Sequence, residues 1–188
     1  MIKQIFEKSK KDKEIIGIRL YKDEDDFWLG FIEDFNDEII QLRHFDQFGL
    51  EDGLVIEQMK GIDSIDYGSN YEKAFQYLIN MQYDLKKLNK IADFKNSDNW
   101  RHEYLKDFKG KDCIIAIEFN KEYVIYGFVY DLDDSEFALN GVDNIGEDEG
   151  MTIYRIEDIT ALKLVDRKCI LRHDLNKWRK KTSGQHMV

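Results

Sequence analysis

Apolar and polar residues alternate along much of the chain in short runs, a pattern that predicts β-strands. In the first half of the chain, strands are expected over residues 14–21, 26–35, 38–45, 54–59 and 62–67. In the second half, they are expected over residues 113–119, 123–132, 136–142, 151–156 and 159–165. Acidic turns and glycines separate the runs. The pattern therefore predicts two groups of five short strands.

Between the two groups, apolar residues recur every three or four positions, which predicts an amphipathic helix from Ser69. Ser69 and Glu72 have the spacing of a capping box. The expected apolar stripe consists of Tyr71, Phe75, Leu78, Met81, Leu85, Leu88 and Ala92. A helix of about six turns is therefore predicted.

Three shorter helices are expected from the same kind of spacing. One or two turns fit residues 1–10, and a short helix fits residues 100–108 within a linker. A C-terminal helix would be capped by Asp166 and would bury Leu171, Leu175 and Trp178 before a polar tail.

An internal repeat explains why the two groups of strands look alike. When the chain is shifted by 97 positions, residues 28–67 align with residues 125–164 without a gap, and ten of these forty positions are identical. The identical pairs are Gly30/Gly127, Phe31/Phe128, Asp34/Asp131, Asp37/Asp134, Leu42/Leu139, Asp46/Asp143, Gly49/Gly146, Gly53/Gly150, Ile56/Ile153 and Ile62/Ile159. This period is too long for a solenoid and indicates a duplicated domain.

The glycines of the repeat suggest what each copy builds. Gly30 and Gly127 interrupt the second strand, where a glycine allows the sharp bend that closes a small sheet. The glycines of the loop between the third and fourth strands are expected at positive φ. We therefore predict an α+β, mainly β fold of two tandem five-stranded small barrels, each followed by a helix. The barrels would occupy residues 1–68 and 109–188, with a connecting helix and linker over 69–108.

The strand order, the glycine in the second strand and the "DG" and "EG" starts of the fourth strand resemble small β-barrels of the Sm-like and SH3-like class. The stretch "GFIEDFNDEIIQL", continued by "FGLEDGLVIEQMKGIDSIDYGSNYEKAF", is similar to uncharacterised bacterial proteins with tandem barrels of this kind. The resemblance implies a fold and no particular activity. Nucleic-acid binding, as in Sm-like proteins, is the alternative function that it suggests.

Composition narrows the class of protein. The chain has 188 residues, is 43% hydrophobic and carries a formal net charge of −10, which disfavours broad affinity for nucleic acid. It has no apolar run of membrane-spanning length and no secretory signal pattern, so a cytoplasmic location is expected. Cys113 and Cys169 are expected to be buried free thiols, and their separation in space stays open.

No catalytic or metal-binding motif is present in the sequence. The four histidines do not form a zinc-binding pattern, and neither nucleophile-elbow nor phosphate-loop motifs occur. The acidic clusters over residues 23–26, 131–134 and 147–149 are expected to be solvated loops, with cation binding as the alternative. We therefore expect no enzyme activity, no cofactor and no metal.

Two surfaces are candidates for binding a partner. Trp28, Phe45 and Phe48 would form a protein-contact patch if they lie on the surface. The basic C-terminal helix either docks on the acidic barrels or contacts nucleic acid through Arg172, Lys177, Trp178, Arg179, Lys180 and Lys181. The expected function is that of a non-enzymatic cytoplasmic binding or adaptor protein that contacts another protein. Nucleic-acid binding is the alternative, and self-association through the long helix is open.

Overall fold

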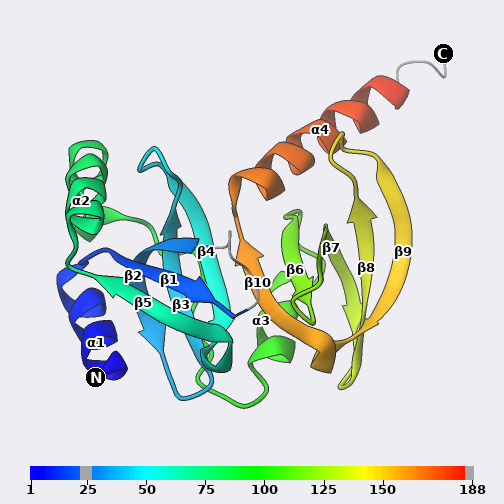
Figure 1. Ribbon diagram of the computed structural model, residues 1–188. Helices are drawn as coiled ribbons and strands as arrows, with labels where there is room; N and C mark the ends of the chain where they lie inside the picture. Colours follow the sequence, from blue (N-terminus) through cyan, green and yellow to red (C-terminus); the bar gives the residue numbers. More distant parts are fainter. Residues whose placement is uncertain (22–26, 185–188) are drawn as a thin grey trace. The chain divides into compact units, whose positions relative to one another are not determined.

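The computed structural model describes residues 1–21 and 27–184, and the acidic run 23–26 and His186 lie outside the described residues. The chain divides into two compact units, Met1–Asn96 and Ser97–Val188. Within the described residues, the fold is mixed α+β and mainly β, with ten strands and four α-helices (Figure 1). The mainly β class predicted from the sequence is confirmed.

The first unit begins and ends with a helix. Its elements are α1 (Ile2–Asp12), β1 (Ile16–Leu20), β2 (Phe27–Phe35), β3 (Ile39–Phe45), β4 (Glu51–Gln58), the 3₁₀ turn η1 (Met59–Gly61), β5 (Ile62–Tyr67), α2 (Asn70–Gln82) and the 3₁₀ turn η2 (Leu85–Lys87). The strands follow the order β5-β1-β2-β3-β4, and all described ladders between them are antiparallel.

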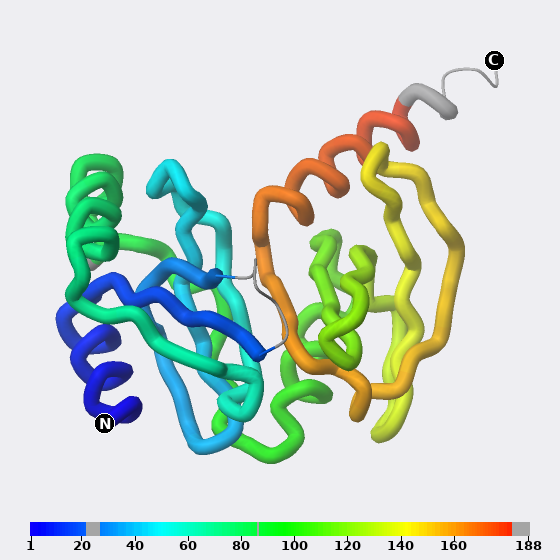
Figure 2. Tube along the Cα trace, in the orientation of Figure 1, coloured from blue at the N-terminus to red at the C-terminus, as the bar shows by residue number. Residues whose placement is uncertain are grey.

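The second unit repeats this plan. Its elements are α3 (Trp100–Phe108), β6 (Ile115–Phe119), β7 (Tyr123–Leu132), β8 (Glu136–Val142), β9 (Asp148–Arg155), the 3₁₀ turn η3 (Ile156–Asp158), β10 (Ile159–Leu164) and α4 (Arg167–Gly184). The order β10-β6-β7-β8-β9 is the same as in the first unit, and its chain path can be followed in Figure 2. The predicted duplication is therefore visible as two equal strand orders.

The two sheets are open where closed barrels were expected. Among the described residues, no ladder joins β4 to β5 in the first unit or β9 to β10 in the second. The strands of each unit therefore do not close on themselves, and five-stranded barrel closure is not observed.

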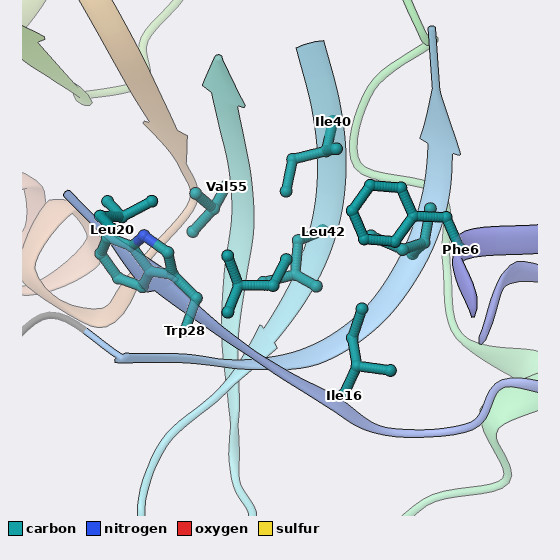
Figure 3. Close-up of a cluster of buried hydrophobic side chains, with 9 residues drawn as sticks. Phe6, Ile16, Leu20, Trp28, Ile40, Leu42 and Val55 are labelled. Carbon is teal, nitrogen blue, oxygen red and sulfur yellow. The ribbon is translucent and has the colours of Figure 1, made fainter. Parts of the chain in front are cut away.

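Helices cover both faces of the first sheet. We call the face that contacts α1 the inner face, and the face that contacts α2 the outer face. Phe6 of α1 is fully buried among the inner-face side chains, with Ile16, Leu42 and Val55 (Figure 3). On the outer face, Phe75 and Ile79 of α2 join a second cluster. The removal of these side chains from water is the main force that holds helices and sheet together.

The second unit uses the same two layers. On its inner face, Phe119 stacks on Tyr154 with ring centroids 4.9 Å apart and lies parallel to Phe137 at 6.3 Å. On its outer face, the buried Cys169 of α4 packs with Ile114, Ala116 and Val142.

Gly30 and Gly127 are required because neighbouring backbone lies close to them. A Cβ at Gly30 would lie 1.9 Å from the Arg43 carbonyl oxygen, and a Cβ at Gly127 would lie 2.3 Å from the Asn140 carbonyl oxygen. The ladder of each strand shifts register shortly afterwards, before Asp34 and before Asp131. The sequence predicted a bend at these two glycines, and the structure shows a close approach of the neighbouring strand at both.

The long helix is shorter than predicted. The capping box of Ser69 and Glu72 is confirmed, but α2 ends at Gln82, and Tyr83 is extended with φ −132° and ψ 142°. The Tyr83 ring packs at 5.9 Å from Phe45. Of the stripe predicted within α2, Phe75 is buried as expected, whereas Tyr71, Leu78 and Met81 are exposed. The other buried side chains of the helix are those of Glu72 and Ile79. The helix therefore ends where Tyr83 leaves it to pack on the sheet.

The predicted connecting segment over residues 69–108 does not stand apart from the two units. The unit boundary falls after Asn96, so α2 belongs to the first unit and α3 to the second. The short helix predicted over 100–108 is confirmed, and it takes the place of α1: Leu105 is fully buried, as is Phe6. Lys109 pairs with Asp131 at 2.6 Å, as Lys10 pairs with Asp34 at 2.7 Å. Each copy is therefore helix, five strands and helix.

Candidate interaction surface

A segment of the first unit's own chain lies along β3 on the outer face of its sheet. After α2, residues 83–96 pass Arg43, whose Nη2 donates to the Asn89 carbonyl at 2.8 Å. Gln41 then donates to the Ala92 carbonyl at 3.3 Å. Arg43 is 2% exposed and pairs with Glu33 at 2.6 Å and Glu51 at 2.5 Å. Such a buried cation is stable only with this full set of partners.

Part of the outer face of the second unit, away from α4, is exposed. At the positions of Glu33, Gln41, Arg43, Leu54 and Ile56, the second copy has Tyr130, Ala138, Asn140, Met151 and Ile153. We call these five residues the bare patch. The side chains of Tyr130, Met151 and Ile153 are 63%, 54% and 67% exposed, whereas Leu54 and Ile56 of the first copy are fully buried. Exposed apolar side chains gathered in this way are typical of an interaction surface.

The bare patch adjoins a free strand edge. β9 is the last strand of its sheet, and Figure 1 shows it, in yellow, with β8 beside it on one side only. Every residue of β9 except Tyr154 is exposed, whereas β4 is buried from Gly53 to Gln58. Backbone N–H and C=O groups along such an edge can pair with a further strand. A shallow hollow of about 180 Å³, lined in part by Ala138 and Ile153, lies at the same place.

The protein-contact residues predicted in the first unit do not form a common patch. Trp28 and Phe45 are 6% and 1% exposed, because both fill the core of the sheet. Phe48 is 64% exposed at the tip of the loop between β3 and β4. The expected patch of three aromatic residues is therefore wrong for Trp28 and Phe45.

The loop tips that carry Phe48 and its equivalent Ile145 are held by the following helix. Gln82 of α2 donates to the Phe48 carbonyl at 3.1 Å, and Arg179 of α4 donates to the Ile145 carbonyl at 2.8 Å. Gln82 and Arg179 are themselves separated by 97 positions. Arg179 was predicted to contact nucleic acid. In the structure it binds the loop backbone, as the uncharged Gln82 does in the first copy.

Other basic residues of α4 also bind carboxylates of the second unit. Lys177 pairs with Asp112 at 2.6 Å, and Lys180 pairs with Asp148 at 3.3 Å. The Arg172 guanidinium lies 3.9 Å from the centre of the Tyr126 ring. Trp178 is 58% exposed, and Lys181 is exposed near the end of the helix. Of the two roles expected for the basic helix, docking on the acidic part of the chain agrees with these contacts.

The apolar stripe predicted for α4 was wrong in two of its three positions. Leu171 is 56% exposed, as Trp178 is at 58%, and the buried positions of the helix are Cys169 and Asn176. Asn176 donates to the Gly146 carbonyl at 3.0 Å and to Asp148 at 2.9 Å. The polar side chain of Asn176 can be buried because it makes hydrogen bonds with the loop. The predicted cap is present, since the Cys169 N–H donates to Asp166 at 2.6 Å.

The two described acidic clusters are engaged in turns and ion pairs. Asp133 accepts the N–H groups of Ser135 and Glu136, both at 2.8 Å, and Glu147 pairs with Arg179 at 2.9 Å. The turn hydrogen bonds lower the pKa of Asp133. Among residues 1–21 and 27–184, no group of three or more His, Cys, Asp or Glu side chains is arranged to hold a metal ion.

Two larger hollows are lined by mixed charges. One of about 1280 Å³ lies in the first unit between α1 and α2, where Lys8 pairs with Glu14 at 2.9 Å. Lys13 also lines it, with its ammonium 4.5 Å from the centre of the Phe31 ring, and partial burial lowers the pKa of Lys13. The other, about 490 Å³, lies in the second unit beside Arg101 and Arg155.

Both cysteines are free thiols, as predicted, but Cys113 is half-buried where a buried thiol was expected. Cys169 is buried, and burial raises the pKa of its thiol, with further contributions from Asp166 and from Cys113. Burial also raises the pKa of Cys113. A thiol whose pKa is raised stays protonated and weakly nucleophilic.

The bare patch was not among the surfaces predicted from the sequence. A usable signal was present, because the alignment of the copies replaces the polar Glu33 and Gln41 by Tyr130 and Ala138. Such apolar replacements remove the polar groups that hold a covering segment on this face in the first copy.

Comparison with known proteins found no match: no family model, no curated protein and no solved structure is significantly similar to this chain. Within the described residues, no helix combines the length and the apolar character needed to cross a membrane.

Proposed function

We propose that this chain is a non-enzymatic binding protein that contacts another polypeptide through the bare patch and the free edge of β9. The proposal is carried by one observation: Ile56 and Ile153 hold equivalent positions, yet Ile56 is fully buried and Ile153 is 67% exposed. When a partner strand pairs with an open edge, it removes the exposed apolar side chains of that edge from water, which lowers the free energy of the complex.

The first unit supports the choice of a polypeptide as the partner. There, the same face is contacted by residues 83–96 of the chain itself, whose carbonyl groups accept hydrogen bonds from Arg43 and Gln41. A partner on the second unit would contact Tyr130 and Ala138 at the positions of Glu33 and Gln41, so apolar contacts would replace polar anchoring.

Capture from a lysate of the source organism tests the proposal with three baits. These are the unaltered chain, Ile153→Lys and the matched control Phe48→Lys, whose original side chain is 64% exposed. A partner that binds the unaltered chain and the control, and is lost with Ile153→Lys, is expected. Capture that Ile153→Lys leaves unchanged would reject the proposal.

Nucleic-acid binding through α4 is the second candidate function. It depends on the proposed resemblance to Sm-like proteins. Its support is the exposed pair Trp178 and Lys181. Its weakness is that Lys177, Arg179 and Lys180 already bind carboxylates. Co-purifying nucleic acid that dissociates on addition of salt would favour it.

A further inference from the structure

We infer that the polypeptide seated on β9 is a second copy of this chain, paired with it strand to strand in a two-fold dimer. The inference rests on the function proposed above, because it names the occupant of the same edge.

The sequence of β9 is complementary to itself in the antiparallel direction. If Thr152 lies opposite Thr152 of the second copy, Met151 lies opposite Ile153 of that copy, and Gly150 lies opposite Tyr154. Met151 and Ile153 are 54% and 67% exposed, and both belong to the bare patch. This register therefore joins two bare patches into one apolar strip.

The charges of β9 agree with the same register. The strand starts with Asp148 and Glu149 and ends with Arg155. Antiparallel pairing brings the acidic start of one strand beside Arg155 of the other, twice per dimer. The Arg155 side chain is 69% exposed, and its described carboxylate contact, with Glu157, is long at 4.0 Å. It is therefore available for a closer partner.

A bulge limits the length of the pairing. The β8–β9 ladder shifts register at Glu149, and Gly150 has a φ of 87°. Regular pairing therefore runs from Gly150 to Tyr154, and the charge contacts between Glu149 and Arg155 flank its two ends. Bulges commonly limit which strands can pair with an edge strand. The bulge leaves only a short segment for pairing, and this segment matches itself in one register.

The first sheet offers a competing edge at β5, the first strand in its order. Pairing of β9 with β5 of another copy would place Arg155 near Asp63 and would extend into open chains or rings. One carboxylate of β5, Asp66, is already paired with Arg19 at 3.0 Å. Two-fold pairing uses groups of β9 alone and closes at two copies.

Charge reversal of the full chain, followed by analytical ultracentrifugation over a concentration series, tests the inference. The unaltered chain and Phe48→Lys are expected to show a monomer–dimer equilibrium, and Ile153→Lys is expected to be monomeric. Glu149→Arg and Arg155→Glu should each weaken the dimer by roughly tenfold, because like charges then face each other twice. An equal mixture of the two variants should regain dimerisation, since each supplies the charge that the other needs.

Three outcomes would overturn the dimer. They are a chain that is monomeric at every concentration, assembly beyond two copies, and a mixture of the charge variants that associates no better than each alone. A monomeric chain that still captures a partner in an Ile153-dependent manner would reject the dimer and leave the proposed function standing. A dimer that captures no other protein would restrict that function to self-association.

Discussion

Ile56 and Ile153 occupy the same position in the two copies of one repeat, and only Ile56 is buried. The difference between the two environments is large, from 0% to 67% exposed. On the same face, residues 83–96 of the first copy lie against Arg43 and Gln41. At these positions the outer face is therefore buried in the first copy, whereas Tyr130, Met151 and Ile153 are exposed at the equivalent positions of the second.

The first prediction follows from this pair. Ile56→Ala should lower the free energy of unfolding by about 2–5 kcal/mol, because it leaves a cavity in a packed core. Ile153→Ala should change the free energy of unfolding of the monomer by no more than about 0.5 kcal/mol, because the side chain is exposed. Urea unfolding at a concentration where the chain is monomeric measures both. Equal losses would show that Ile153 is buried in the monomer.

The second prediction concerns the close approach at Gly30 and Gly127. Alanine at either position should destabilise its unit by about 1–3 kcal/mol or more, because the new Cβ would lie within 2.3 Å of a carbonyl oxygen. Gly141→Ala is the matched control, since its nearest neighbour would be a side-chain atom at 3.3 Å. Thermal unfolding of the three variants gives the comparison. A mild effect at Gly127 together with a large one at Gly141 would contradict the described strand contact.

The third prediction concerns the repeated aspartate of the loop between the third and fourth strands. Asp46 accepts the N–H groups of Phe48 and Leu50, both at 2.9 Å, and Asp143 accepts those of Ile145 and Glu147 at 3.0 and 2.7 Å.

Asp46→Ala and Asp143→Ala should each cost about 1 kcal/mol of unfolding free energy, because two loop N–H groups lose their acceptor. Asp134→Ala, an exposed acid in another turn, serves as the control. Chemical denaturation of the three variants provides the measurement, and losses no greater than that of Asp134→Ala would refute the role of the loop aspartates.

These loops show which features of the fold can be predicted from the sequence. The glycines and aspartates of the repeat, the capping box of Ser69 and the helix over 100–108 depend on local backbone geometry, and sequence patterns report that geometry directly. The end of α2 could not be read, because Tyr83 leaves the helix to pack on Phe45, a contact between residues far apart in the chain. Barrel closure and the burial of Trp28 are likewise decided by tertiary packing.

The fourth prediction concerns the docking of α4 at low pH. Hydrogen bonds from Lys177 and His173 lower the pKa of Asp112 below its ordinary value. A carboxylate with a lowered pKa stabilises the folded state above the pKa of the unfolded chain, and this stabilisation is lost as the pH falls through the folded pKa. The unaltered chain should therefore be more stable than Asp112→Asn near pH 6.

The difference should disappear as the pH is lowered through about 4 and below, where Asp112 becomes protonated. Melting temperatures of the two proteins along a pH series give the result. A difference that persists unchanged to pH 2 would show that the charge of Asp112 is not what holds α4.

Site-specific photocrosslinking in living cells tests the central claim most directly. A photoreactive residue placed at position 153 is predicted to give a discrete crosslinked polypeptide, either a second copy or another protein. The same residue at position 48 is predicted to give none. Crosslinks from position 48 or 178 to protein or nucleic acid, with none from position 153, would contradict the assignment of the β9 edge as the binding surface.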